Sequence, residues 1–213
     1  MSEEDKFLKA LKKLREEESK KSKKRSFDQT IDLIVNLKEF DVRKHSFNIF
    51  VDIPNKFKEK KIAGFFEKDS KIIDSIKRDN FVKYKDKKDI KKLANSYDNF
   101  VANAKLMPAI ATSFGRILGP IGKMPSPRLG IIGNEDVESI KKVIERINST
   151  TRVMVKEPSI KVGIAKESLE DKKIIENILS CYKKILDNLP KNKDNVKNVK
   201  IKFTMGKPVS VEL

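Results

Sequence analysis

Apolar and polar residues alternate along several short segments of the chain. TIDLIVNL (30–37) and FNIFVDIP (47–54) place an apolar residue at every second position. This period predicts strands with one face in a core and one face in water. Strand signals return in TRVMVK (151–156), SIKVGIA (159–165) and NVKIKFT (198–204). Both ends of the chain are therefore expected to contribute half-exposed strands.

Two segments near the ends of the chain have helical periodicity instead. In residues 2–18 the apolar side chains share one face, and Ser2 with Asp5 three positions later forms a capping pair. Residues 167–189 carry an apolar stripe that includes Cys181. The run KKSKKR (20–25) follows the first helix and fits either a solvated linker or an arm that contacts phosphates.

Between residues 60 and 150 the pattern of apolar residues is different and predicts short strands that alternate with helices. Such alternation is typical of an α/β unit with a parallel sheet. The predicted strands are 61–66, 81–84 and 99–104, and the predicted helices are 68–79, 86–96, 105–118 and 134–148, the last one capped by Asn134.

These patterns predict a chain of mixed class, α+β and α/β, with two domains. The N-terminal segment has only about two strands, and a lone hairpin is marginally stable in water. Residues 1–58 are therefore expected to join residues 154–213 in one split α+β domain. Residues 60–152 would form a Rossmann-like α/β domain inserted into it, and the two chain crossings between the domains would act as a hinge.

Charge narrows the range of partners. The 213 residues contain 48 Lys plus Arg against 31 Asp plus Glu, which gives a net charge of +17. A field of this sign concentrates polyanions, so nucleic acid is the first candidate and an anionic membrane surface the second. No apolar run is long enough to span a membrane and the N-terminus has no signal-peptide pattern, so we expect a soluble intracellular protein without a membrane partner.

Glycine and proline are concentrated in FGRILGPIGKMPSPRLG (114–130), where a lysine follows a glycine. A phosphate-binding loop of the Walker type needs a first glycine at position 117 and Ser or Thr at position 124. Ile117 and Met124 stand there instead, and no G-x-G-x-x-G occurs. A bound nucleotide therefore has no support from the motif.

Other catalytic arrangements are equally weak. The chain has one histidine, His45, and one cysteine, Cys181, so neither a Cys/His zinc site nor an internal disulfide can form. His45 lies in a polar connection, and Cys181 lies on the apolar stripe of a helix, where packing is the stronger interpretation. We therefore expect a protein that is not an enzyme and that needs no cofactor.

Four stretches together resemble the ribosomal protein L1 family, whose member is the protein of the mobile large-subunit stalk. GRILGPIGKMPSPRLG (115–130) resembles the family's signature loop, and SFDQTIDLIVNL (26–37) its first strand. SIKVGIAK (159–166) and FTMG (203–206) are similar to the strand before the long helix and to the turn near the C-terminus. The resemblance spans 26–213 in the family's order and also implies a split domain with an α/β insertion.

The resemblance implies a surface for ribosomal RNA (rRNA) on the split domain. Phe27 and the Thr-Met-Gly turn (204–206) are expected to contact this RNA. The alternatives are that Phe27 is a core residue and that Thr-Met-Gly is an ordinary turn. Lys161 and Lys166 lie beside them in the sequence pattern and could contact phosphate. The residues that match the family's motifs are Phe27, Thr30, Thr204, Met205 and Gly206.

The same resemblance implies that the 114–130 loop faces the hinge or a transfer RNA (tRNA), with a purely structural loop as the alternative. Its residues of interest are Arg116, Gly119, Gly122, Lys123 and Arg128.

Three positions depart from the family's usual pattern. Gln29 stands where many members have Glu, and Ser26 where a basic residue is common. Lys207 follows Thr-Met-Gly, where bacterial members have Pro. The turn TMGKP (204–208) resembles the eukaryotic form more, whereas the 115–130 loop is nearer the archaeal and bacterial forms. This mixture favours an archaeal source.

The family's function supplies the expected partners. They are the stalk of large-subunit rRNA, deacylated tRNA that leaves the exit site, and the protein's own messenger RNA (mRNA), whose translation it would repress. The expected form is a monomer within the large ribosomal subunit, in the cytoplasm. Two other functions remain open from the residues alone: an α/β enzyme that modifies RNA with the 114–130 loop, and a non-specific basic protein that packages nucleic acid.

Overall fold

The computed structural model describes residues 2–20, 26–70, 72–84 and 86–212. The chain has a mixed α/β architecture with three sheets among these residues, and it divides into two compact units. The terminal unit comprises Met1–Lys58 and Ser149–Leu213, and the inserted unit comprises Glu59–Asn148. Most of the basic run 20–25 lies outside the described residues, so its role stays open.

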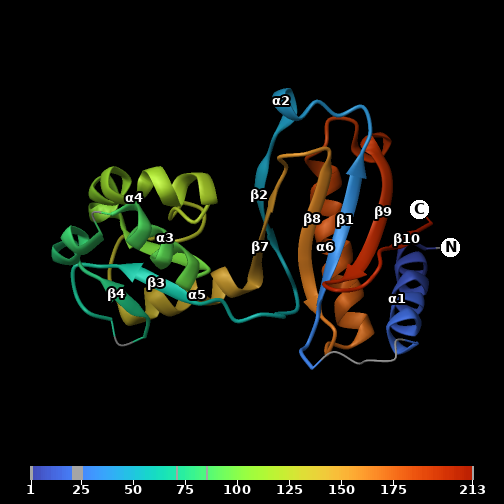
Figure 1. Ribbon diagram of the computed structural model, residues 1–213, viewed down its shortest axis with the longest axis horizontal. Coiled ribbons are helices and arrows are strands. Elements are labelled where there is room, and N and C mark those ends of the chain that lie inside the picture. Colours follow the sequence, from blue (N-terminus) through green and yellow to red (C-terminus); the bar gives the residue numbers. More distant parts are fainter. Residues whose placement is uncertain (1, 21–25, 71, 85, 213) are drawn as a thin grey trace. The chain divides into compact units, whose positions relative to one another are not determined.

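A four-stranded antiparallel sheet forms the centre of the terminal unit (Figure 1). Its order is β10-β9-β1-β8, which places the first strand of the chain between two strands from the C-terminal segment. Burial alternates strictly along β1, as the sequence predicts. The strands are β1 (Thr30–Leu37), β8 (Ser159–Lys166), β9 (Val196–Phe203) and β10 (Val209–Val211).

Two long helices supply the apolar side chains that cover one face of this sheet. They are α1 (Glu3–Ser19) and α6 (Asp171–Asp187), and Cys181 of α6 is fully buried in the shared core. The predicted cap is confirmed, since the side chains of Ser2 and Asp5 form a reciprocal capping box. Two short elements connect the strands: α2 (Val42–His45) and η3 (Asn192–Asn195).

A second, two-stranded sheet pairs β2 (Asn48–Asp52) with β7 (Thr150–Met154). Because β7 pairs with β2, residues from Ser149 onward belong to the terminal unit. The buried amide of Asn177 on α6 fixes the chain after β2. Its Oδ1 accepts from the backbone N–H of Asn55 at 3.0 Å, and its Nδ2 donates to the Asn55 carbonyl at 3.0 Å.

The inserted unit contains a parallel sheet of order β4-β3-β5-β6, with helices in the connections (Figure 1). An aromatic cluster of Phe65, Phe81, Phe100 and Phe114 fills its core. The strands are β3 (Ile62–Phe65), β4 (Asp74–Ile76), β5 (Asn99–Asn103) and β6 (Ile131–Ile132). The helices are η1 (Arg78–Tyr84), α3 (Lys87–Ser96), η2 (Ala104–Leu106), α4 (Met107–Ile121) and α5 (Val137–Ser149).

Two predicted elements of this unit are wrong. The described residues of 68–79 contain no α-helix; Asp74–Ile76 form β4, which pairs with β3, and Arg78 and Asp79 begin η1. The serines explain part of the difference, because Ser75 Oγ accepts from the Ser70 N–H at 2.8 Å, and such local bonds compete with helix formation. Residues 81–84, predicted as a strand, belong to the 3₁₀-helix η1, from which Phe81 packs on Phe114.

The predicted cap of α5 is also wrong. The helix begins at Val137, and the Asp136 carbonyl accepts its first bond, from Ile140, at 3.0 Å. The preceding Glu135 carboxylate accepts from the backbone N–H of Glu67 at 2.9 Å and from the Asn103 amide at 2.7 Å. Glu135 therefore joins the start of α5 to the ends of β3 and β5.

Candidate functional site

Three strands of the terminal unit converge where β1 begins. The register places Thr30 opposite Lys166 of β8, and the turn after β9 lies on its other side. The Thr204 N–H donates to the Thr30 carbonyl at 3.0 Å, and its hydroxyl donates to the same carbonyl at 3.2 Å. The Thr30 N–H donates to Thr204 Oγ1 at 3.2 Å. The two threonines thus join the turn to β1.

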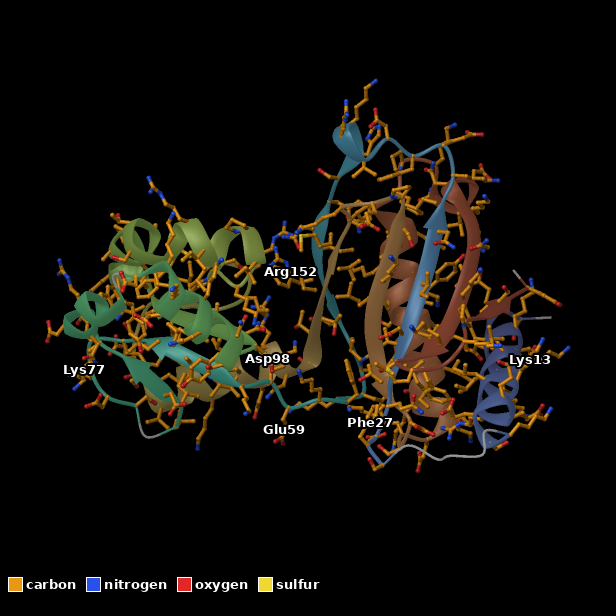
Figure 2. The ribbon with its side chains drawn as sticks, viewed as in Figure 1. Lys13, Phe27, Glu59, Lys77, Asp98 and Arg152 are labelled. Carbon is orange, nitrogen blue, oxygen red and sulfur yellow. The ribbon has the colours of Figure 1, made fainter. Side chains whose placement is uncertain are left out.

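Two large apolar side chains are exposed at this end of the sheet. Phe27, labelled in Figure 2 near the start of β1, is 51% exposed, and Met205 in the turn is 55% exposed. Gly206 keeps the turn tight: its N–H donates to the Phe203 carbonyl at 2.9 Å, and an added Cβ would lie 3.2 Å from Phe203 Cβ. Phe27 is therefore not a core residue, and Met205 projects from a closely packed turn.

A buried amide positions this turn from behind. Gln29 is 1% exposed, and its Oε1 accepts from the Met205 N–H at 3.4 Å. Its Nε2 donates to Glu18 Oε1 at 3.1 Å and to Glu167 Oε2 at 3.3 Å. Both donor hydrogens of the amide are used, and a carboxylate at this position could donate neither bond. Sequence reasoning noted Gln29 as a departure but did not give it this role.

The lysine at the end of β8 is part of the same arrangement. Lys166 Nζ donates to the Asp28 carbonyl at 2.8 Å, which leaves two of its three hydrogens for other acceptors. The Asp28 carboxylate accepts from the Ser168 hydroxyl at 2.8 Å. Phe27, Thr30, Lys166, Thr204, Met205 and Gly206 are therefore brought together at one end of the sheet.

Lys161 lies farther along the open face of the sheet. It is opposite Ile34, and its ammonium lies 3.6 Å from Glu157. Lys200 of β9 is opposite Ile34 from the other side, and Lys202 is opposite Asp32. Sequence reasoning did not single out Lys200 and Lys202 as site residues, although the alternation of β9 already pointed both of them outward.

Asp32 is an acidic side chain on the same face of the sheet, opposite Lys202. Burial raises the pKa of the Asp32 carboxyl above its usual value, and the positive charge of Lys202 opposes the rise. The carboxylate lies on the half-exposed face of β1. It therefore lowers the positive potential at the centre of the face.

The 114–130 segment is only partly a loop. Residues up to Ile121 continue α4, so Arg116 and Gly119 are helical and exposed. Gly122 ends the helix in the left-handed region, at φ 79°, where glycine is favoured. Arg128 is exposed beyond the helix.

Lys123 has a structural contact in place of an open phosphate-binding position. Its ammonium donates to the carbonyl of Ala94 at 2.7 Å and to that of Tyr97 at 2.8 Å. These carbonyls lie at the C-terminal end of α3, where cations are favourable. Lys123 thus joins the end of α4 to the end of α3.

Within the described ranges, no group of three or more His, Cys, Asp or Glu side chains could hold a metal ion. Burial raises the pKa of the Cys181 thiol to about 12, so it is not an activated nucleophile. No helix among the described residues is long and apolar enough to cross a membrane.

An open sheet face with lysines on two strands, and with an exposed aromatic side chain at its end, is an arrangement typical of nucleic-acid-binding proteins. Comparison with known proteins gives the family. Residues 19–207 match the ribosomal protein L1p/L10e family, and the chain belongs to this family.

Archaeal relatives match over nearly their whole length. The large ribosomal subunit protein uL1 of Nanoarchaeum equitans is 36% identical over 203 residues, which is 91% of this chain and 95% of the relative. The protein of the same name from Methanobrevibacter smithii is 34% identical, over 96% of this chain and 97% of the relative. That from Pyrobaculum aerophilum is 38% identical, over 90% and 88%.

Proposed function

We propose that this chain is a structural, non-catalytic protein of the large ribosomal subunit that binds the stalk region of large-subunit rRNA. The observation that carries the proposal is the end of the terminal sheet. There Phe27 and Met205 are both more than half exposed, beside a pair of hydrogen-bonded threonines. Family membership supports the choice of rRNA, because the relatives carry the name of a large-subunit protein.

The terminal unit would correspond to the split rRNA-binding domain. Phe27 and Met205 would stack on or pack against bases and riboses, and Gly206 would let the RNA backbone approach closely. Lys161 and Lys166 would contact phosphates, and we add Lys200 and Lys202 to this set. Recognition would then depend on the shape of the RNA and on its 2′-hydroxyls more than on a long base code.

The finer functions follow from the family resemblance. The inserted unit would assist the departure of deacylated tRNA from the exit site, with Arg116 and Arg128 as the exposed basic residues near its signature segment. Lys123 is a weaker candidate, since its ammonium is bonded to two carbonyls. The chain would also repress its own synthesis by binding a similar element in its mRNA.

A competition of two RNAs tests the main proposal. The full chain is titrated with the stalk rRNA fragment and with a scrambled RNA of equal length, at about 0.2–0.5 M salt, where non-specific phosphate binding has largely faded. We expect a preference of about a thousandfold for the stalk fragment, a value within the usual range of specific binders. Equal binding would indicate a non-specific basic protein and would overturn the proposal.

Variants locate the surface in the same assay. Met205→Asp places a charge where an apolar contact is expected, and Thr204→Ala removes the hydroxyl that holds the turn to Thr30. Both should weaken stalk binding far more than Lys123→Ala does. The reverse order would place the rRNA surface on the inserted unit.

A further inference from the structure

A separate cavity of about 390 Å³ lies in the terminal unit, near the start of β9. The Thr204 turn follows the other end of the same strand, so the cavity and the proposed rRNA surface are distinct. Polar side chains from α1, α6, η3 and β9 converge on it. They are Glu3, Lys6, Tyr182, Lys193, Lys197 and Asn198.

Tyr182 is the residue that distinguishes this cavity from an ordinary surface hollow. Its side chain is 2% exposed, and its ring packs edge-on against Phe7 with the centroids 5.7 Å apart. No described residue forms a hydrogen bond with its hydroxyl. Among the described side chains, Arg15 Nε is the only fully enclosed polar atom without a partner, so the Tyr182 hydroxyl retains access to the cavity.

A phenol hydroxyl without a partner costs free energy unless water or a ligand bonds to it. Burial, and secondarily the charge of Glu3, raise the pKa of Tyr182 to about 12. The hydroxyl therefore stays protonated at neutral pH and can donate to an acceptor. A phosphate oxygen is one such acceptor.

The residues that line the cavity carry a net positive charge, which favours an anionic ligand. Three lysines and one glutamate line the cavity, which gives a net charge of +2. Lys193 forms an ion pair with Glu3 at 2.5 Å, whereas Lys6 and Lys197 have no ion pair with any residue that the structure describes. Two lysines without an ion pair to the described residues thus line the same cavity as Tyr182, and the net charge of the lining balances that of a phosphate dianion.

We propose that this cavity binds a phosphate monoester, with its phosphate between Lys6, Lys193 and Lys197 and bonded to the Tyr182 hydroxyl. The apolar side chains of Val196 and Val211 at the lining would contact the organic part of the ligand. The volume lies at the lower end of the usual range for ligand sites and suits a nucleoside monophosphate. This binding would be independent of the proposed rRNA surface.

A ¹H–¹⁵N NMR titration of the full chain tests the site with three probes: uridine 5′-monophosphate, inorganic phosphate and uridine. We expect saturable shift changes at the amides that line the cavity with both phosphate probes, stronger binding of the nucleotide, and no saturable change with uridine. Shifts spread evenly over the basic surface, or equal binding of uridine, would overturn the proposal.

Two matched pairs of variants remove the ambiguity that a highly basic protein creates. Tyr182→Phe deletes only the hydroxyl and should weaken nucleotide binding by about tenfold without loss of folding, because no described hydrogen bond is broken. Tyr97→Phe deletes a hydroxyl that donates to Asp74 at 2.8 Å in the inserted unit, and should bind as the unmodified chain does.

Lys197→Ala should likewise weaken binding severalfold, whereas Lys172→Ala, which removes an exposed lysine on α6 that belongs to neither proposed site, should not. Full affinity in Tyr182→Phe, or equal losses in the two lysine variants, would show that the phosphate binds the surface charge and not the cavity. RNA is absent from this titration, so a negative result would leave the proposed rRNA function untouched.

Discussion

The exposed phenyl ring of Phe27 offers the sharpest test of the rRNA surface. An aromatic side chain can bury about 150–250 Å², so the exposed 51% of Phe27 corresponds to roughly 100 Å². At about 25 cal/mol per Å² this area is worth about 2.5 kcal/mol when RNA covers it. Stacking of a base on an aromatic ring contributes about 1–3 kcal/mol, which agrees with this value.

Phe27→Ala should therefore cost about 2 kcal/mol of binding, which is about a thirtyfold rise in the Kd for the stalk rRNA fragment. The measurement is a titration with the fragment at about 0.2–0.5 M salt. Because the ring is already half exposed, folding should change little. The thermal unfolding midpoint should fall by no more than about 2–4 °C.

Val137→Ala is the matched control, since Val137 is 57% exposed but begins α5 in the inserted unit. It should bind the fragment as the unmodified chain does. The reasoning would be refuted if Phe27→Ala bound within about threefold of the unmodified chain, or if Val137→Ala lost as much affinity.

Three further substitutions test the structure. Lys123→Ala should destabilise the inserted unit by about 1–3 kcal/mol in a denaturant titration, because two carbonyls lose a charged donor, and should leave stalk binding unchanged. Gly115→Ala should stabilise α4 by about 0.5–1 kcal/mol in the same titration, since an added Cβ meets nothing within 4 Å. For Asp32 the raised pKa means that the folded chain loses stability as pH rises from the ordinary value of 3.8 through the folded pKa. Asp32→Asn should therefore unfold at a higher temperature at pH 7 and lose this advantage below about pH 3.8; it should also bind RNA more tightly, and a stability gain that does not depend on pH would contradict this account.

Elements with a single strong period were predictable from the sequence. The strand β1 alternates without interruption, and Ile31, Leu33 and Val35 are all fully buried, because one face of the sheet meets two helices. The capping pair of α1 was equally readable, since Ser2 and Asp5 satisfy each other within one turn. Such elements depend on local chemistry and on one apolar face, and both are visible in the order of residues.

The inserted unit was harder to predict because its signals conflict. In residues 68–79 the apolar spacing allows a helix, but Ser70 and Ser75 bond locally and the segment pairs with β3. In the signature segment, glycine and proline indicate a loop. The helix predicted over 105–118 nevertheless continues to Ile121, and its apolar side chains Ile110, Phe114 and Leu118 are fully buried.

The candidate site shows where sequence reasoning stops. Lys123 and Lys166 look alike in the sequence, since each is a lysine in a segment that resembles a family motif. Lys123 has both of its observed bonds to the end of α3, within the inserted unit, whereas Lys166 has one bond and lies beside Thr30. A lysine becomes a phosphate ligand only if some of its hydrogens remain free, and that depends on which carbonyls the fold brings near it. The same holds for Tyr182, whose apolar neighbours predict a core residue, although it also lines a cavity with residues from distant parts of the chain.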